Sequence, residues 1–402
     1  MIDLSRETPA GLPRRPETAD TVARTVLVYR HRLAPRSEVA FLRRFYQGFE
    51  RLTPAWVGCY RGDGATQLTA EPLILGRAGP FGALDRTLFR HLGTVPPVPD
   101  LRTLRPRLVH AHFGRGGAFA LPLARFLGVP LVVTFHGGDA TKEAHYRRNL
   151  IPRIYERRLA ALQREAAAFV CVSDFVRDRL AARGFPPEKL IVIHQGVELG
   201  AGCDDAGAAA SGPEPYVLFV GRFVEKKGAR DLIAAMRTLR DRGAPVRLVL
   251  VGDGPLAAAL REQAAGLSGV TFLGWQSNDE VRRLMRRALA VCVPSVTARD
   301  GDAEGLPSVI FEAMAEGVPV VGSRHAGIAE AIEHERTGLL VPPGDPAALA
   351  AAIARLAAAP EERRQLGDMA RRVAADRFDA VRQSRRLEQV LLRVVDEAQH
   401  RR

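Results

Sequence analysis

Cysteine is scarce in this 402-residue sequence, and the spacing of the four cysteines excludes two kinds of site. Cys59, Cys171, Cys203 and Cys292 lie far apart, and no two of them form a C-x-x-C pair. We therefore predict neither a disulfide framework nor a zinc site, which fits a reducing compartment. Cys171 and Cys292 fall within apolar, strand-like runs, so we predict that both are small core residues.

Long apolar runs are also missing. No run reaches the roughly 18–20 residues that a membrane-spanning helix needs, and the polar, proline-containing start of the chain does not resemble a signal peptide. With 47% hydrophobic residues, the chain is long enough for two domains, each with a substantial core. We expect a soluble protein in the cytoplasm.

Lysine and aromatic residues are few, whereas arginine is abundant. The only lysines are Lys142, Lys189, Lys226 and Lys227, although the net charge is +13. Much of the arginine bias is what a GC-rich genome produces, and the remainder would suit an anionic membrane surface, at on the order of 1 kcal/mol per basic residue. Because aromatic residues make up 6% and no zinc-finger or stacking motif is present, we expect no nucleic-acid partner.

Apolar, strand-like runs alternate with helix-like runs in two separate parts of the chain. This alternation is typical of α/β domains with parallel sheets. A stretch rich in glycine, alanine and proline, without periodicity, lies between the two parts and is typical of a linker. We predict a disordered tail (1–22), an N-terminal Rossmann-like domain (23–198), a linker (199–215), a C-terminal Rossmann-like domain (216–375) and a final helix (376–402).

The clearest functional pattern lies in residues 294–330. A short apolar strand opens there into a polar loop, which leads to a helix predicted over residues 307–316. Ligands of open parallel sheets bind beyond the carboxyl ends of the strands, where this loop begins. Gly305 would let the backbone approach a ligand closely, and Pro307 and Ser308 suit a first helical turn, whose free N–H groups favour an anion such as phosphate.

Two carboxylates, Glu304 and Glu312, bracket this helix start with the spacing E-x7-E. Because a carboxylate beside a bound diphosphate would be repelled, these two more plausibly accept hydrogen bonds from sugar and ribose hydroxyls. The alternative is a solvated loop glutamate and an ordinary helix-face glutamate.

A family resemblance rests on the same stretch. EGLPSVIFEAMAEGVPVV, followed by GIAEAI and TGLLVPPGD, resembles the donor-binding half of retaining glycosyltransferases of family 4. The resemblance extends well over about residues 105–375 and poorly over the first hundred. It implies the GT-B architecture: an N-terminal acceptor domain and a C-terminal donor domain that face each other across a cleft, with the last helix crossing back to the first domain. It also implies transfer of a sugar from a nucleotide-diphosphate donor to an acceptor hydroxyl.

The resemblance assigns roles to the donor-side residues. GRFVEKKG is similar to the family's diphosphate-binding turn, so Arg222 and Lys227 would offset the charge of the departing diphosphate; we prefer Lys227 to Lys226 because it directly precedes the glycine. Glu304 would hold the sugar and Glu312 the ribose. The predicted donor-binding residues are Gly221, Arg222, Lys227, Gly252, Trp275, Glu304, Gly305, Leu306, Pro307, Ser308 and Glu312.

His136 follows an apolar strand and precedes a Gly-Gly-Asp turn, so we expect it at the carboxyl end of a strand. TFHGGD resembles the family segment whose histidine contacts the donor sugar near the reacting carbon, with Asp139 as a possible orienting partner. His136 thus joins Glu304, Arg222 and Lys227 as a predicted catalytic residue. On the acceptor side we place Glu38, His112, Asp139 and Ser173; a plain helix N-cap explains Ser173, or the Ser37-Glu38 pair, equally well.

Two short patterns in the sequence are typical of metal ligands. His110 and His112 have H-x-H spacing but no third ligand nearby in the sequence, and Asp300 and Asp302 form a D-x-D in a loop where the resembled family uses basic residues instead. We therefore predict no metal and no other cofactor.

The N-terminal features resemble relatives that extend lipid-linked oligosaccharides for bacterial exopolysaccharide or lipopolysaccharide. We therefore expect a lipid-linked or saccharide acceptor and a peripheral enzyme at the inner face of the plasma membrane. A non-catalytic nucleotide-sugar-binding subunit of another transferase and a GT-B-like epimerase remain alternatives.

An apolar stripe at helical spacing bears on the membrane question. It is formed by Phe81, Leu84, Leu88 and Leu92, and we predict that it belongs to the core, as such stripes usually do. The GT-B resemblance implies the alternative, since an apolar and basic surface on this domain often faces the membrane in GT-B enzymes. The candidate membrane-facing basic residues are Arg43, Arg44, Arg86 and Arg90.

Overall fold

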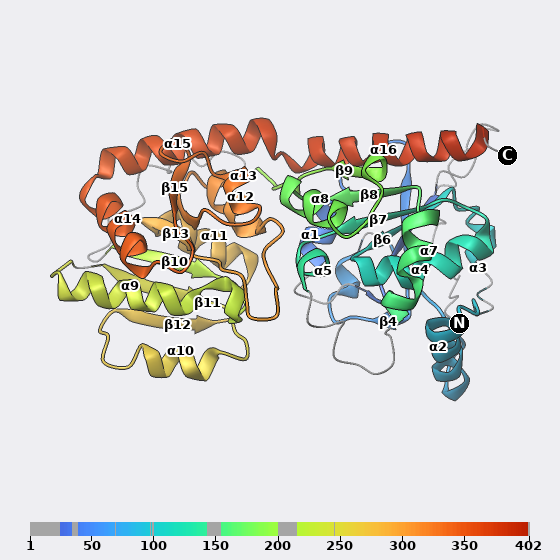
Figure 1. Cartoon of the computed structure of the whole chain (residues 1–402), viewed down its shortest axis with the longest axis horizontal. Helices are drawn as coiled ribbons and strands as arrows, with labels where there is room; N and C mark the ends of the chain where they lie inside the picture. The colour runs from blue at the N-terminus through green and yellow to red at the C-terminus, as the bar shows by residue number, and fades with distance from the viewer. Residues whose placement is uncertain are drawn as a thin grey trace, which may run out of the picture.

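In the computed structural model the described residues are 25–33, 39–68, 70–96, 98, 100–142, 154–199, 215–244 and 246–400. They form two parallel-sheet α/β domains that lie side by side, with the C-terminal helices running along both (Figure 1). The predicted tail, Glu38, Cys203 and most of the predicted linker lie outside the described residues. No helix in the described ranges is both long enough and apolar enough to cross a membrane.

The first domain is built on a sheet whose seven described strands are all parallel. From edge to edge they are β5 (Leu73–Ile74), β3 (Thr53–Gly58), β1 (Thr25–Tyr29), β6 (Leu108–His112), β7 (Leu131–Phe135), β8 (Ala168–Cys171) and β9 (Leu190–Val192). Strands β6, β7 and β8 are buried at every position, as expected of a parallel sheet covered by helices on both faces. Cys171 is buried in β8, as predicted.

Helices and short elements complete this domain. The helices are α1 (Val39–Arg44), α2 (Pro80–Leu92), α3 (Asp100–Thr103), α4 (Gly114–Leu127), α5 (Gly138–Thr141), α7 (Ile154–Glu165) and α8 (Asp174–Ala181), with single 3-10 turns at η1 (Ala65–Gln67) and η2 (Pro187–Lys189). Two short strands, β2 (Arg32–Leu33) and β4 (Tyr60–Arg61), pair with each other.

The second domain has a sheet of six described strands, again all parallel. Their order is β12 (Val270–Gly274), β11 (Arg247–Val251), β10 (Tyr216–Val220), β13 (Ala290–Val293), β14 (Val320–Ser323) and β15 (Gly338–Val341). The strand order reverses between β10 and β13, which is the kind of switch point where ligands bind in open α/β sheets. Cys292 is buried in β13, as predicted.

The helices of this domain are η4 (Glu225–Lys227, a 3-10 turn), α9 (Ala229–Asp241), α10 (Ala257–Gln263), α11 (Asn278–Arg287), α12 (Ser308–Ala315), α13 (Ile328–Ala331), α14 (Pro346–Ala358) and α15 (Pro360–Arg377). Strand β14 begins at Val320, after Val318 and Pro319. The Val318 N–H donates to the Ala313 carbonyl at the end of the preceding helix, and Pro319 has no N–H for a hydrogen bond within the sheet.

The last helix, α16 (Ala380–His400), crosses back and lies along the first domain (Figure 1), as expected. Ser384 Oγ donates to the Phe45 carbonyl at 2.9 Å and accepts from Gly48 N at 3.0 Å. Leu387 and Leu391 are fully buried in the core of that domain. Helix α16 therefore ties the two domains together.

The apolar stripe on α2 is not part of the core, so that prediction is wrong. Phe81, Leu84 and Leu92 are 62%, 53% and 73% exposed. The Arg77 side chain and backbone N–H bind the Asp85 carboxylate at 2.9 Å, which turns the face of Asp85 and Phe89 toward the protein. The neighbouring face of the helix, with the apolar stripe, points outward.

Candidate active site

The carboxyl ends of the two sheets face each other, and their loops meet backbone to backbone. A Cβ built on Gly305, in the loop after β13, would lie 2.3 Å from the His136 carbonyl oxygen, and one built on Gly137 would lie 2.3 Å from Gly305 N. A Cβ on Gly327 would lie 1.8 Å from the Gly305 carbonyl oxygen. Gly305 does permit a close approach, but in this structure the approaching group is the backbone of the other domain.

Side chains reinforce this contact. Ser173 Oγ donates to the Gly305 carbonyl at 3.0 Å and also accepts from Val176 N at 3.2 Å. Ser173 is therefore the N-cap of α8, and it also contacts the loop of the second domain. Its place on the acceptor side stays a prediction. Nearby, Thr141 Oγ1 accepts from Ala303 N at 3.0 Å.

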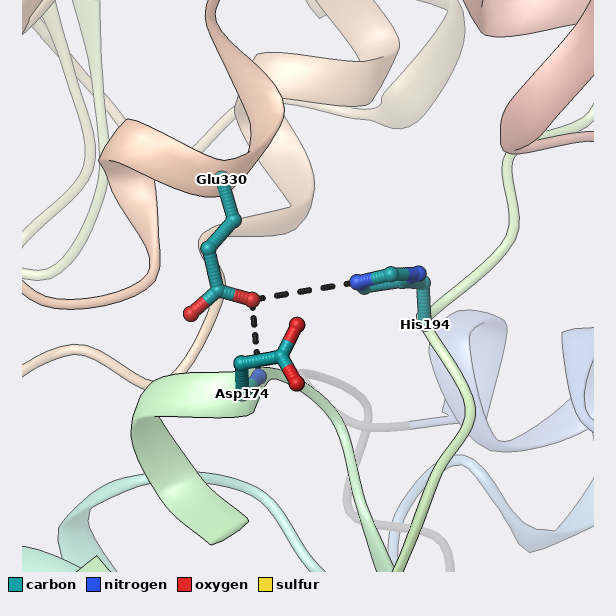
Figure 2. A group of neighbouring side chains, drawn as sticks. All are labelled: Asp174, His194 and Glu330. Atoms are coloured by element: carbon teal, nitrogen blue, oxygen red, sulfur yellow. Dashed lines mark hydrogen bonds and ion pairs between the residues drawn. The ribbon is translucent and has the colours of Figure 1, made fainter. Parts of the chain in front are cut away.

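Glu330 of α13 caps the same helix from the opposite domain (Figure 2). Its carboxylate accepts the N–H groups of Asp174 and Phe175 at 2.7 Å each, and the His194 ring lies 3.8 Å away. Asp174, His194 and Glu330 lie close enough to hold a metal ion, but both Glu330 oxygens already bind backbone amides. The cluster is explained as an interdomain helix cap, which the sequence did not reveal.

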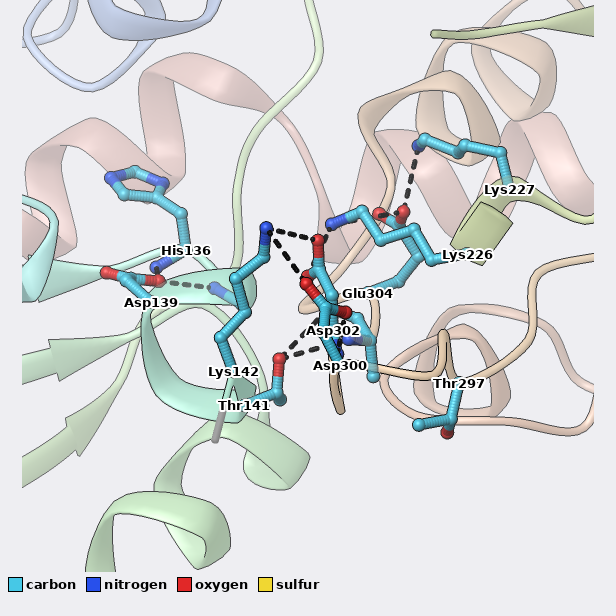
Figure 3. Close-up of polar contacts among 12 residues, drawn as sticks. His136, Asp139, Thr141, Lys142, Lys226, Lys227, Thr297, Asp300, Asp302 and Glu304 are labelled. Atoms are coloured by element: carbon cyan, nitrogen blue, oxygen red, sulfur yellow. Dashed lines mark hydrogen bonds and ion pairs between the residues drawn. The ribbon is translucent and has the colours of Figure 1, made fainter. Parts of the chain in front are cut away.

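Glu304 lies in the loop that follows β13 and is only 6% exposed. Its Oε1 is 3.2 Å from Lys227 Nζ and 3.5 Å from Lys226 Nζ (Figure 3). Burial acts to raise the pKa of this carboxyl, but the two ammonium groups outweigh burial and hold the pKa below its ordinary value, so Glu304 is ionised at neutral pH. Within the described residues, Oε1 has no hydrogen-bond partner of regular geometry.

Three of the four lysines gather around this loop, from both domains. Lys226 Nζ lies 3.1 Å from Asp302 Oδ1, and Lys142 Nζ lies 3.0 Å from Asp302 Oδ2 and 3.7 Å from Asp300 Oδ2. Of these three lysines, we predicted only Lys227 as a site residue. The scarcity of lysine in the sequence could have indicated a role for all three. The ammonium groups on the D-x-D carboxylates make this pair a poor place for a divalent cation.

Glu312, on α12, pairs with Arg44 of the first domain. Arg44 Nη1 lies 2.9 Å from Glu312 Oε1, and the arginine is only 8% exposed. The expectation that Arg44 faces a membrane is wrong. Neighbouring side chains of a helix point about 100° apart, so Arg43 is exposed whereas Arg44 is buried against the second domain. Arg44 is a cleft residue that sequence analysis missed.

Two of the remaining predicted donor residues are exposed, and the others lie in glycine turns or at the start of α12. The backbones of Gly221 and Gly252 meet, since a Cβ on Gly252 would lie 2.0 Å from the Gly221 carbonyl oxygen. Leu306 is buried, Pro307 is the N-cap residue of α12, and Ser308 is its first residue. In contrast, Arg222 and Trp275 are exposed.

His136 and Asp139 lie together, but not as expected. Asp139 Oδ1 accepts from the backbone N–H groups of His136 and Gly137 at 3.0 and 2.9 Å, and Oδ2 accepts from Gly114 N at 3.0 Å. Asp139 therefore holds the backbone of the loop, and the His136 ring is oriented by His112, whose Nδ1 lies 3.0 Å from His136 Nε2. Figure 3 shows the ring turned toward the first domain, away from Glu304. Burial lowers the pKa of His136 to about 3.

Comparison with known proteins gives matches in both domains. The family model described as "Glycosyltransferase Family 4" matches residues 57–200, and the one described as "Glycosyl transferases group 1" matches residues 214–359. The chain is 35% identical over 250 residues to the amylovoran biosynthesis glycosyltransferase AmsK of Erwinia amylovora and to the putative colanic acid biosynthesis glycosyltransferase WcaL of Escherichia coli. These matches cover 61% of this chain and 60% of each relative.

A further relative and two solved structures extend the comparison. The chain is 32% identical over 272 residues to a GDP-mannose-dependent phosphatidylinositol monomannoside mannosyltransferase of Mycobacterium tuberculosis, covering 63% of this chain and 69% of the relative. Anabaena HepE in complex with UDP is similar with a TM-score of 0.71 at 21% identity, over 91% of this chain and 98% of HepE. Sucrose-phosphate synthase of Thermosynechococcus elongatus has a TM-score of 0.70 at 23% identity, over 93% and 99% of the two chains.

Proposed function

The chain belongs to glycosyltransferase family 4 and has the GT-B fold, and on that premise we propose that it is a retaining glycosyltransferase that moves a sugar from a nucleotide diphosphate to an acceptor hydroxyl. The observation that carries the proposal is Glu304. It is a buried, ionised carboxylate with an oxygen that lacks a regular hydrogen bond, flanked by lysines at the switch point of the second sheet. Such a group suits a ligand rich in hydroxyls and negative charge.

The lysines and Glu304 would exchange partners when the donor binds. In the structure, Lys226 and Lys227 lie against Glu304. A diphosphate carries more charge than one carboxylate and would draw Lys227, with Arg222, to its oxygens. Glu304 is then available to accept hydrogen bonds from the sugar, and the cations offset the charge that develops on the leaving group.

We propose same-face substitution for the chemical step. The acceptor oxygen bonds to the anomeric carbon on the face from which the diphosphate departs, the carbon–oxygen bond to the diphosphate breaks, and the acceptor proton passes to the released phosphate oxygen. Glu304 is a weaker candidate for a covalent nucleophile, because two ammonium groups stabilise its charge. No metal is needed for this scheme, since Lys226, Lys227 and Arg222 supply the positive charge.

The donor class can be tested by thermal unfolding in EDTA with UDP, GDP or ADP. HepE binds UDP and the mycobacterial relative uses GDP-mannose, so we expect one of these two nucleotides to stabilise the protein. At a hundred times its dissociation constant a ligand adds about 2.7 kcal/mol, a rise in Tm of a few degrees.

Two variants sharpen this experiment. The shift should disappear in Lys227→Ala and persist in Lys189→Ala, because Lys189 binds the Gln163 and Arg164 carbonyls outside the cleft. No shift with any nucleotide, or a shift only after Mg²⁺ is restored, would contradict the proposed site.

We further propose a lipid-linked oligosaccharide acceptor in exopolysaccharide or lipopolysaccharide synthesis, reached from the inner face of the plasma membrane. AmsK and WcaL, named for amylovoran and colanic acid biosynthesis, support this direction. The exposed face of α2 supports it as well. Phe81 and Leu84 project from α2 beside the guanidinium of Arg77, which lies 5.2 Å from the Phe81 ring centroid.

Replacing Phe81 and Leu84 together with serine should weaken binding to anionic phosphatidylglycerol vesicles at least tenfold. The reason is that burial of such side chains in the interface contributes about 1.5–3 kcal/mol each when complete. Vesicle co-sedimentation at low salt measures the effect. Leu273→Ser, an exposed leucine of the second domain, is the control that should bind like the parent. If the parent protein does not bind these vesicles, the membrane proposal is wrong.

A further inference from the structure

Five charged side chains of alternating sign form one row that crosses from the first domain to the second. Lys142 Nζ lies 3.0 Å from Asp302 Oδ2, and Lys226 Nζ lies 3.1 Å from Asp302 Oδ1. Lys226 Nζ is also 3.5 Å from Glu304 Oε1, which lies 3.2 Å from Lys227 Nζ. Figure 3 shows Lys142 and Lys226 approaching the Asp302 carboxylate from opposite sides. Each carboxylate of the row therefore lies between two ammonium groups.

The two lysines beside Glu304 differ in the number of carboxylates that hold them. Lys226 lies between Glu304 and Asp302, whereas among the described residues Lys227 pairs with Glu304 alone. Burial acts to lower the pKa of Lys226, but Glu304 and Asp302 outweigh burial and raise the pKa above its ordinary value. Lys226 is therefore a charged side chain held on two sides.

The backbone around Asp302 and Lys226 keeps the pair in place. The Asp302 N–H donates to Asp300 Oδ1 at 3.0 Å. A Cβ built on Gly138 of α5 would lie 2.6 Å from Asp302 Oδ1, so the first domain packs directly against this carboxylate. On the other side, the Lys226 carbonyl accepts from Val296 N at 2.9 Å, which ties the lysine turn to the loop that contains Asp302.

The side chain of Lys227 lies along a different part of the site. A Cβ built on Gly221 would lie 3.6 Å from both Cδ and Cε of Lys227, so the lysine stem passes over the glycine turn that follows β10. This turn is at the switch point between β10 and β13, where the proposed function places the diphosphate. Lys227 is therefore the lysine that lies along the proposed diphosphate site.

We infer that Asp302 is a positioning residue that holds Lys226 beside Glu304 when the donor binds. Lys227 has one carboxylate to leave, and the diphosphate has the greater charge. Lys226 has two, which together match the two negative charges of the diphosphate in a nucleotide sugar, so it gains nothing by leaving. Loss of either carboxylate would free Lys226 to move. The inference rests on the proposed function and adds that Glu304 keeps one counter-charge while it binds the sugar.

Asp302→Asn tests the inference, because it removes the charge and keeps the shape. Lys226 can then follow Lys227 to the phosphates. Titration calorimetry with UDP and GDP in EDTA should show an affinity about fivefold higher than that of the parent for the nucleotide that binds. The kcat for sugar transfer should fall about tenfold, because Glu304 has lost both lysines in the transition state. A residue with a merely structural role would lower affinity and kcat together.

Lys226→Met is the second variant, and it decides the question even where Asp302→Asn fails to fold. Its kcat should fall about tenfold, whereas its nucleotide affinity should stay within about twofold of the parent value, because Lys226 does not reach the phosphates. In the Lys226→Met background, Asp302→Asn should change neither value further, since Asp302 acts through Lys226.

Asp300→Asn is the matched control. It makes the same change of charge two residues away, where the carboxylate lies 3.7 Å from Lys142 Nζ, and asparagine can still accept from Asp302 N. Affinity and kcat should both stay within twofold of the parent values.

The inference is wrong if Asp302→Asn has the nucleotide affinity of Asp300→Asn. It is also wrong if Lys226→Met loses as much affinity as Lys227→Ala, which would show that Lys226 itself binds the diphosphate. The proposed function is judged on the parent protein. A parent that binds neither UDP nor GDP contradicts the donor site and the inference together, whereas a parent that binds and transfers, with Asp302→Asn unchanged, contradicts the inference alone.

Discussion

Glu304→Gln should lower kcat by about 100- to 1,000-fold, as expected when a charged group that binds in the transition state is lost. Glutamine keeps the volume of the side chain and one acceptor oxygen but loses the charge that orders the lysines and the sugar. The affinity for the nucleoside diphosphate should be retained or increased. The reason is that Lys226 and Lys227, at 3.5 and 3.2 Å from Glu304 Oε1, no longer have to leave a carboxylate to reach the phosphates.

Steady-state transfer of a labelled sugar and calorimetric titration of the nucleotide measure the two effects. Glu316→Gln is the control, because Glu316 is a half-buried glutamate at the end of α12 that pairs with Arg282 and Arg286 at 3.2 and 2.9 Å and not with the lysines. It should lower Tm and leave kcat within twofold. If Glu304→Gln turns over at the parental rate, or if it loses nucleotide affinity and activity in parallel, the proposed role of Glu304 is wrong.

Glu388→Ala should be the most destabilising single change on α16, at about 4 kcal/mol. The Glu388 carboxylate is buried and accepts the backbone N–H groups of Glu50 at 3.0 Å, Arg51 at 2.7 Å and Leu52 at 2.6 Å. Alanine leaves these three donors without the acceptor that they share. The corresponding fall in Tm is roughly 5 °C, measured by scanning calorimetry.

Glu397→Ala lies on the same helix, at an exposed position, and should change Tm by less than about 1 °C. Glu388→Gln should fall between the two, since an amide oxygen accepts but carries no charge. If the Tm of Glu388→Ala equals that of the parent protein, the prediction is wrong and α16 is held by its apolar face alone.

The sequence predicts this molecule best where one local pattern decides the outcome. Strands β1 and β13 lie in short apolar runs between polar turns, a pattern that leaves few alternatives. The Glu304 loop was found from its glycine, proline and paired carboxylates, which are all local features. The same reasoning failed for α2, where the stripe of Phe81 and Leu84 has the right period but the Arg77–Asp85 pair turns the other face inward.

Contacts between the domains could not be predicted from local patterns. The Arg44–Glu312 pair joins residues 268 positions apart, and Glu330 caps a helix 156 positions earlier in the chain. Each partner alone is an ordinary charged residue of a helix. The scarcity of lysine could have identified Lys142 and Lys226, but only the folded chain shows that they approach one loop from opposite domains.

The crossing of α16 also has a consequence for the order in which the protein folds during synthesis. The N–H groups of residues 50–52 leave the ribosome early, whereas Glu388, their acceptor, is made more than 300 residues later. The last strand of the first domain, β9, ends at Val192. At roughly 5–20 residues per second, the first domain then waits on the order of 10–40 s for the segment that completes it. During that interval the surface that Leu387 and Leu391 will cover is open to solvent. A nascent chain is therefore most exposed to misassociation after its first domain has been made and before α16 has emerged.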